Sequence, residues 1–161
     1  MFAAGAELIA ICANTMHLVA GDVAAAAGTV PLVSIVDTVR DACVASGVRR
    51  LGLLGTAYTM ESPDLYPLPL ARKGIEVLVP EANDRATINR HTFDELIRDI
   101  VTDDARRAFR EACERLVDRG ADAIALACTE HGMVLRDGDV SVSILDSTEL
   151  HVRALVDRSL A

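Results

Sequence analysis

An apolar run over residues 120–127 ends abruptly on Cys128, Thr129 and Glu130, and it constrains the fold more than any other feature. Continuous hydrophobic runs of this kind are typical of parallel strands that are covered on both faces. In open α/β sheets, the groups just past the carboxyl end of such a strand line the ligand crevice. The turn that follows has free backbone N–H groups, which can hold a carboxylate or lower the pKa of a thiol. The run therefore predicts a buried strand with Cys128 at a candidate site.

The same pattern occurs twice in the chain. Residues 5–15 align without a gap with residues 120–130, and residues 33–38 align with residues 142–147. Two matches in the same order and at similar offsets indicate two related halves. In the second half, two strands and two helical segments precede the apolar run, whereas the first half has almost nothing before its run. We expect a complete first half to begin roughly 67 residues before Met1.

Strands alternate with helical patterns along the whole chain. The expected strands are residues 5–13, 31–36, 48–54, 75–80, 120–128 and 140–145, and the expected helices are residues 14–27, 37–46, 63–72, 84–119 with a break near 101–103, and 147–160. This alternation predicts an α/β fold with parallel sheets and flanking helices. We expect two pseudo-symmetric lobes. The first and incomplete lobe would combine residues 1–46 with 140–161, and the second would be residues 47–139.

Composition excludes several classes of partner. Hydrophobic residues make up 51% of the chain and aromatic residues only 3%, which favours close helix–sheet packing over an all-β sandwich. The net charge of −8 argues against a nucleic-acid surface, because such a surface needs a basic patch. No segment reaches membrane-spanning length without charges, and the start of the chain carries no basic leader region. We therefore expect a soluble, cytoplasmic protein without nucleic-acid or membrane partners.

The cysteines fall into two kinds. Cys12, Cys43, Cys113 and Cys128 show no spacing typical of a metal site, so no metal is expected. A disulfide framework is not expected in a chain of this class. Cys43 and Cys113 lie inside helical patterns, where a free cysteine is usually a small buried hydrophobe. Cys12 and Cys128 differ because each lies where a predicted strand ends.

A family resemblance rests on several motifs that occur in a fixed order. They are Cys-Ala-Asn-Thr-Met-His at 12–17, Gly-Thr-Ala-Tyr-Thr-Met at 55–60, Cys-Thr-Glu at 128–130 and Asp-Ser-Thr-Glu-Leu-His at 146–151. Together they resemble the motifs of the aspartate/glutamate racemase family. The resemblance covers the whole chain against the last two-thirds of a typical member, so the N-terminal third has no counterpart. It implies paired pseudo-symmetric α/β lobes, no cofactor, and a small acidic amino acid held between the lobes.

The resemblance also implies a mechanism. A thiolate removes the α-proton of an amino acid on one face and a thiol returns a proton on the other, which inverts the centre. Cys128 and Cys12 are the candidate acid–base pair, and helix N-termini would lower their pKa values. The candidate substrate-binding residues are Asn14, Thr15, Thr56, Thr59, Thr129 and Glu130. Glu130 could also orient a base or cap its helix. Neither a metal nor pyridoxal is required.

The first thiol does not stand where the resemblance requires it. Ala13 aligns with Cys128 in the internal repeat, and in the family the thiol usually comes directly before the Asn-Thr pair. Neighbouring residues of a strand point to opposite faces, so Cys12 should face away from the site. Three functions stay open. They are a racemase or isomerase that pairs Cys128 with His17 or Cys12, a one-thiol decarboxylase that resembles the arylmalonate decarboxylases, and a non-catalytic protein that binds an acidic metabolite.

Two further expectations concern surfaces. The strand at residues 5–13 would lack sheet neighbours and helical cover, which leaves an unpaired apolar edge. We expect a homo-oligomer to cover it. His91 lies in a charged helical pattern, and we expect it at the surface.

Overall fold

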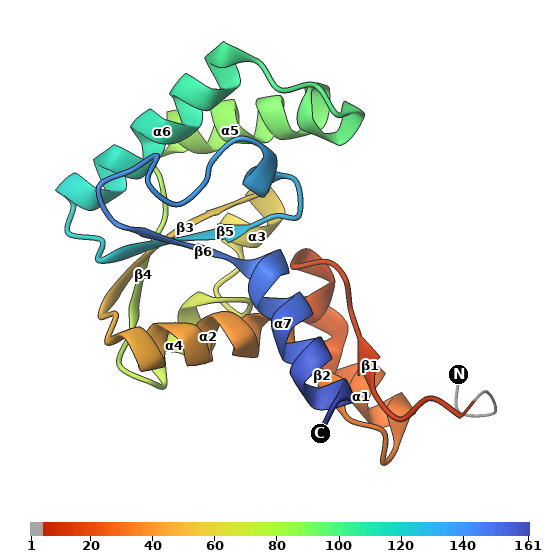
Figure 1. Ribbon diagram of the computed structural model, residues 1–161. Coiled ribbons are helices and arrows are strands. Elements are labelled where there is room, and N and C mark those ends of the chain that lie inside the picture. Colours follow the sequence, from red (N-terminus) through yellow and green to blue (C-terminus); the bar gives the residue numbers. More distant parts are fainter. Residues whose placement is uncertain (1–4) are drawn as a thin grey trace.

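The computed structural model describes residues 5–161 of the chain, which form two parallel sheets flanked by helices (Figure 1). The larger sheet has the order β4 (Glu76–Leu78), β3 (Arg50–Gly55), β5 (Ala123–Ala127) and β6 (Ser143–Asp146). The smaller sheet consists of β1 (Ile9–Ala10) and β2 (Leu32–Val33). This architecture confirms the predicted α/β class with parallel sheets.

The two sheets repeat one arrangement of strands. Ile9 of β1 pairs with Leu32 of β2, just as Ile124 of β5 pairs with Ile144 of β6. The other edge of β5 is fully paired with β3. Among residues 5–161, no strand pairs with the corresponding edge of β1. The smaller sheet therefore lacks a counterpart of β3 within the described chain.

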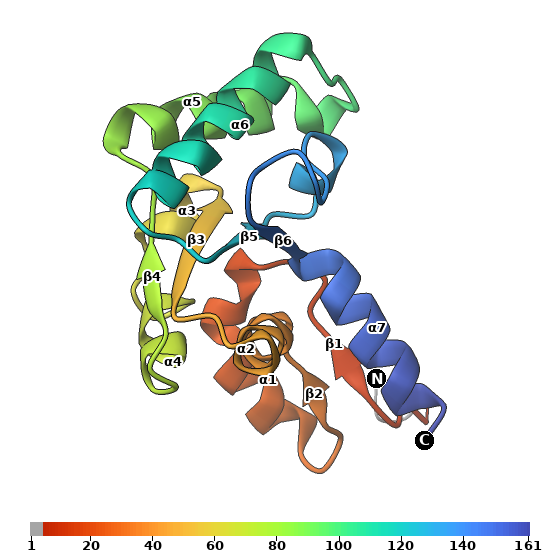
Figure 2. The same cartoon turned by 60° about the vertical axis from the view of Figure 1, so that its left-hand side comes forward.

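Helices cover both faces of the larger sheet (Figures 1 and 2). On one face lie α2 (Ile35–Ser46) and α4 (Pro67–Ala71), and on the other lie α5 (Ala82–Asp94) and α6 (Asp103–Asp118). The remaining helical elements are η2 (Thr15–Val19), α1 (Ala20–Ala27), α3 (Ala57–Glu61), η3 (Leu96–Arg98), η4 (His131–Met133) and α7 (Ser147–Ser159). A buried cluster fills the space on each side of the sheet. Cys43 belongs to one cluster and Cys113 to the other, and both are fully buried, which confirms their packing roles.

Side-chain caps decide where several helices begin. Thr102 caps α6, so the break expected near residues 101–103 is confirmed, and Asp146 caps α7. The predicted start of the second long helix at Asp37 is wrong. Ser34 accepts the backbone N–H of Asp37 and caps a helix that begins at Ile35. The helix thus takes residues that were assigned to a strand over 31–36, and only Leu32–Val33 remain extended in a ladder.

Two segments assigned to the first lobe pack with the larger sheet instead. β6 pairs with β5, and the buried side of α2 belongs to the same hydrophobic cluster as Leu51 and Ala123 of that sheet. Because β6 is the parallel neighbour of β5, its aliphatic residues complete the sheet of the second lobe. α7 packs against α2 and also against β2, and so joins the two sheets. Residues 1–4 of the predicted first lobe lie outside the described residues.

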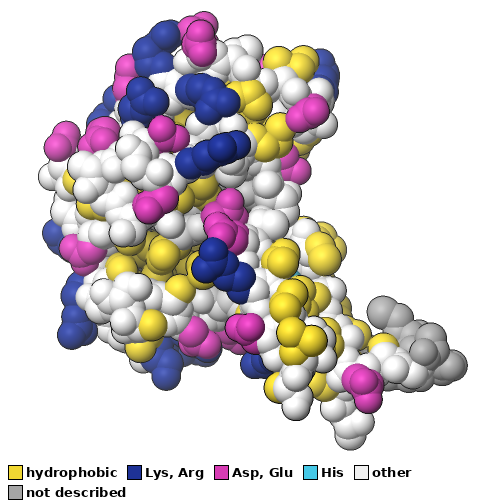
Figure 3. Space-filling model, in the orientation of Figure 1, with side chains coloured by type: hydrophobic (Ala, Val, Ile, Leu, Met, Phe, Trp, Pro, Cys, Tyr) yellow, Lys and Arg dark blue, Asp and Glu magenta, His cyan; other side chains and the backbone are white. Residues whose placement is uncertain are grey.

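Hydrophobic side chains gather on the outer surface of α7 (Figure 3). Val152, Val156 and Leu160 are 53%, 48% and 82% exposed. These side chains lie on one exposed helix and form a continuous apolar strip of its surface. Within residues 5–161, no helix combines the length and the apolar character needed to cross a membrane.

Candidate active site

Cys128 is the first residue after β5, and it is buried beside a carboxylate. Its Sγ donates to Glu130 Oε2 at 3.0 Å, and Thr129 Oγ1 donates to the same oxygen at 2.7 Å. Burial, followed by the hydrogen bond to Glu130, raises the pKa of the Cys128 thiol to about 12. Burial also acts to raise the pKa of Glu130, but hydrogen bonds from Cys128 and Thr129 hold that pKa below its usual value. The resting site therefore holds a protonated thiol that donates to an ionised carboxylate.

Asn14 anchors the segment that follows β1. It is 4% exposed, its Nδ2 donates to Ser147 Oγ at 3.0 Å, and its Oδ1 accepts from the Tyr66 hydroxyl. Ser147 is the first residue of α7, directly after β6. Asn14 stands at the N-cap position of η2, but its side chain makes no capping hydrogen bond. The amide instead ties the first sheet to the larger one.

Three threonine hydroxyls meet at the end of β3. Thr15 Oγ1 lies 2.9 Å from Thr59 Oγ1, and Thr56 Oγ1 lies 3.4 Å from the same atom. Thr56 directly follows β3, and Thr59 is fully buried in α3. These residues were selected from separate motifs as candidate carboxylate ligands. The structure brings their hydroxyls together.

The segment of residues 13–15 crosses the carboxyl end of β5. Asn14 is tied to the first residue after β6, and Thr15 is tied to the helix after β3. Since β5 lies between β3 and β6, the segment passes over the end of β5, where Cys128 lies. Ligands of open α/β sheets bind at this edge. Cys128 and residues 13–15 accordingly lie at the same edge of the sheet, and the region between them is called the crevice below.

The His17 side chain holds the segment of residues 13–15 through a hydrogen bond to its backbone. The backbone N–H of Ile35 donates to Nε2 at 3.0 Å, so Nδ1 carries the proton and donates to the Ala13 carbonyl at 2.9 Å. Burial lowers the pKa of His17, which favours this neutral form. Both ring nitrogens are engaged with the backbone. His17 is therefore placed as a support for Ala13, and the expectation that it could serve as the second acid does not fit this arrangement.

Cys12 and two histidines take no part in the hydrogen bonds of the crevice. The Cys12 thiol is exposed and forms no hydrogen bond with the described site residues. His131 is fully buried, burial lowers its pKa to about 3, and its ring packs edge-on against Phe109 at a centroid distance of 4.8 Å. The predicted surface position of His91 is wrong. It is 4% exposed, because its Nδ1 contacts Glu95 Oε1 at 2.8 Å across the end of α5.

Sequence reasoning missed two residues that hold the crevice together. Tyr66 is completely buried, and no pattern in the sequence distinguishes it from a core aromatic residue. Ser147 lies within one of the motifs, next to a capping aspartate, and was assigned no role of its own. Within the part of the chain described, no three His, Cys, Asp or Glu side chains come together in a group that could hold a metal ion.

Comparison with known proteins relates the chain to one family model and to several solved structures. It matches the model of the Asp/Glu/Hydantoin racemase family over residues 1–155. A candidate Asp/Glu racemase from Yersinia pestis is 38% identical and superposes with a TM-score of 0.92 over 99% of this chain and 69% of that one. An aspartate racemase homologue from Pyrococcus horikoshii is also 38% identical, with a TM-score of 0.87 over 99% of this chain and 70% of that one. The aspartate racemase of Picrophilus torridus has the same fold at 21% identity and a TM-score of 0.73, over 98% and 64% of the two chains.

The fold and crevice define an α/β protein with repeated parallel sheets and a buried thiol at a strand end. The family match and the two structures at 38% identity make the assignment specific. The chain belongs to the Asp/Glu/hydantoin racemase family, a family of isomerases. This confirms the resemblance seen in the motifs.

Proposed function

We propose that this chain is an isomerase that acts without a cofactor at the α-carbon of an acidic amino acid, with Cys128 as its acid–base group. The observation that supports the proposal most strongly is the Cys128 thiol bonded to Glu130 at the carboxyl end of β5. The substrate class follows from the similar proteins, which are described as Asp/Glu or aspartate racemases and their homologues. The grouped hydroxyls of Thr15, Thr56 and Thr59 would bind a carboxylate of the substrate.

The proton moves in a closed cycle on one face of the substrate. Glu130 accepts the thiol proton, and the Cys128 thiolate then takes the proton from Cα, whose electron pair passes into the adjoining carboxylate as an enediolate. The Cys128 thiol exchanges this proton with water and then returns a proton to Cα, and Glu130 returns the first proton to sulfur. A substrate ammonium group beside the site would favour the thiolate, because an opposite charge stabilises it.

On the opposite face, residues 13–15 of the described chain offer no thiol. Ala13 carries only a methyl group where the internal repeat places a residue equivalent to Cys128. We therefore expect the proton at Cα to exchange with solvent faster than the centre inverts. Inversion would require a proton from water on the Ala13 side, or a proton from Cys12 after the end of β1 twists toward the site.

Deuterium exchange tests this proposal. The Cα protons of both enantiomers of aspartate and glutamate are followed by NMR in heavy water, and inversion is followed by chiral chromatography. Exchange should be lost in Cys128→Ala and retained in the matched control Cys12→Ala. Exchange that survives Cys128→Ala would contradict the role of this thiol. No exchange with any of the four compounds would favour a non-catalytic protein that binds an acidic metabolite.

One observation favours a second candidate, a one-thiol decarboxylase. The Cys128 thiol is held protonated, which is the form that delivers a proton to an enediolate. In that reaction the bond from Cα to one carboxylate breaks, and that carboxylate leaves as carbon dioxide. The electron pair of the broken bond stays behind as the enediolate, and the thiol protonates Cα. Carbon dioxide release from a substituted malonate, lost in Cys128→Ala, would support this candidate.

The exposed face of α7 leads to a proposal about assembly. Val152 and Val156 form part of the hydrophobic surface, and a second copy of the chain would remove it from water. Light scattering should show a homo-oligomer that dissociates in the double variant Val152→Glu/Val156→Glu. A monodisperse monomer in the unmodified protein would contradict the proposal.

A further inference from the structure

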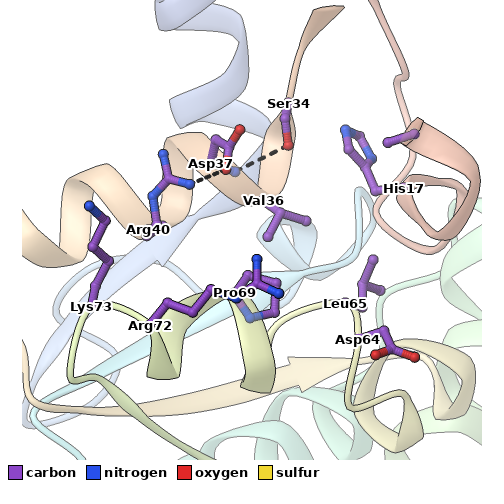
Figure 4. Close-up of a pocket in the computed structure, with 11 residues that line it drawn as sticks. His17, Ser34, Val36, Asp37, Arg40, Asp64, Leu65, Pro69, Arg72 and Lys73 are labelled. Atoms are coloured by element: carbon purple, nitrogen blue, oxygen red, sulfur yellow. Dashed lines mark hydrogen bonds and ion pairs between the residues drawn. The ribbon is translucent and has the colours of Figure 1, made fainter. Parts of the chain in front are cut away.

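A cavity of about 270 Å³ is lined in part by His17 (Figure 4). The ring of His17 also holds residues 13–15, called the catalytic segment below, through the Ala13 carbonyl. Its walls come from the first turns of α2, from η2 and α1, and from residues 64–73 around α4. Cys128 and the threonine hydroxyls do not line it. The cavity is slightly smaller than the pockets that hold drug-sized molecules, and it suits a molecule the size of an amino acid.

Charged side chains of both signs line the cavity. Figure 4 shows Arg40 and Lys73 on one side and His17 and Asp64 on the other, with Arg72 extending from the first side toward the second. Arg40 is paired with Asp37, which also lines the cavity, and with Asp41. Among residues 5–161, Arg72 and Lys73 take part in no ion pair, and neither does the carboxylate of Asp64.

Unpaired cations beside one another repel, and this repulsion is relieved when an anion binds between them. The amino-terminal end of α2, a helix of 12 residues, adds positive potential at the same wall. The opposite wall offers the Asp64 carboxylate, which would attract an ammonium group.

We propose that this cavity is a second, non-catalytic binding site for an acidic amino acid. The two carboxylates of the ligand lie toward Arg72 and Lys73, and its ammonium group lies toward Asp64. His17 lines the cavity and also holds the Ala13 carbonyl, so the ligand lies one side chain away from the catalytic segment. The choice of ligand rests on the substrate class proposed above, but the site itself rests on the cavity and its charges.

Amide NMR on the ¹⁵N-labelled chain tests this site separately from the crevice. Cys128→Ala serves as the background so that L-glutamate is not turned over during the titration. The amides of Val36, Asp37 and Lys73 report on the cavity, and those of Thr129 and Glu130 report on the crevice. L-glutamate should shift both sets.

Substitutions in the cavity should remove only one set of shifts. In Arg72→Gln/Lys73→Gln, the cavity should bind L-glutamate at least about tenfold more weakly. The control Arg49→Gln/Arg98→Gln removes two exposed cations outside the cavity and should bind as before. Asp64→Asn should weaken L-glutamate but leave glutarate, which lacks the ammonium group, unchanged.

The outcomes distinguish the two proposals. Unshifted cavity amides at about 20 mM L-glutamate, or equal affinity in the Arg72/Lys73 variant, would overturn the second site. Equal weakening of glutamate and glutarate by Asp64→Asn would overturn the assigned orientation and thus the amino-acid ligand. Shifted cavity amides with a silent crevice would support the second site while counting against the proposed catalytic substrate.

Discussion

Removing the Asn14 side chain should test how the catalytic segment is held. Asn14 accepts from the Tyr66 hydroxyl and donates to the Ser147 hydroxyl, and all three residues are buried. Asn14→Ala leaves both hydroxyls without this partner. It should therefore destabilise the fold and also release residues 13–15 from their position over β5.

The magnitude follows from the number of buried groups left unpaired. A buried polar group that loses its partner costs about 1–3 kcal/mol. Two hydroxyls are affected, those of Tyr66 and Ser147. We expect the free energy of unfolding to fall by about 2–3 kcal/mol in Asn14→Ala. Tyr66→Phe removes one donor and should cost about 1 kcal/mol.

Urea denaturation at pH 7 measures these changes, and a double-mutant cycle isolates the bond between Asn14 and Tyr66. The cycle should give a coupling free energy of about 1 kcal/mol. Asn83→Ala, at an exposed position on α5, is the matched control and should change stability by less than about 0.5 kcal/mol. The reasoning is refuted if Asn14→Ala costs no more than this control, or if the effects of Asn14→Ala and Tyr66→Phe simply add.

Three other predictions concern proton chemistry. Ala13→Cys supplies a thiol on the second face, so inversion should rise at least about tenfold relative to Cα exchange, as measured by chiral chromatography; an unchanged ratio would contradict the placement of Ala13. Glu130→Gln removes the charge that helps raise the pKa of Cys128, so iodoacetamide should alkylate this thiol several-fold faster near pH 9 in a Cys12→Ala background; an equal rate would show that Glu130 does not control the thiol. The pKa of His131 is about 3 in the folded chain against an ordinary 6.5, so the unfolded chain binds the proton first as the pH falls. Stability should drop by about 2 kcal/mol between pH 6.5 and pH 4.5 in urea titrations, and His131→Leu should flatten this slope.

Local sequence patterns were sufficient to predict the strand that carries the thiol and the polar residues at the strand ends. The apolar run before Cys128 indicated a buried parallel strand with a thiol at its carboxyl end, and the structure has that strand at Ala123–Ala127. The residues selected at strand ends, among them Thr15 and Thr59, do come together. Such predictions succeed because hydrophobic runs and turn residues are properties of consecutive positions.

The start of a helix is hard to predict where two capping residues lie close together in the sequence. Ser34 and Asp37 are both good capping residues, and the sequence does not say which one the backbone uses. The structure selects Ser34, because the backbone N–H of Ile35 is taken up by His17 and the helix can begin there. A residue from a distant turn thus contributes to the start of α2.

The sequence by itself determined the α/β class, the repeat of strand arrangements and the position of the thiol, since these depend on the order and polarity of neighbouring residues. Only the tertiary structure decided that Asn14 joins Tyr66 and Ser147, that β6 lies beside β5, and that His17 has no free nitrogen. These contacts connect residues far apart in the chain. Their partners are chosen by which buried polar groups meet when the sheets and helices pack, because a buried donor or acceptor must find a partner wherever the fold places one.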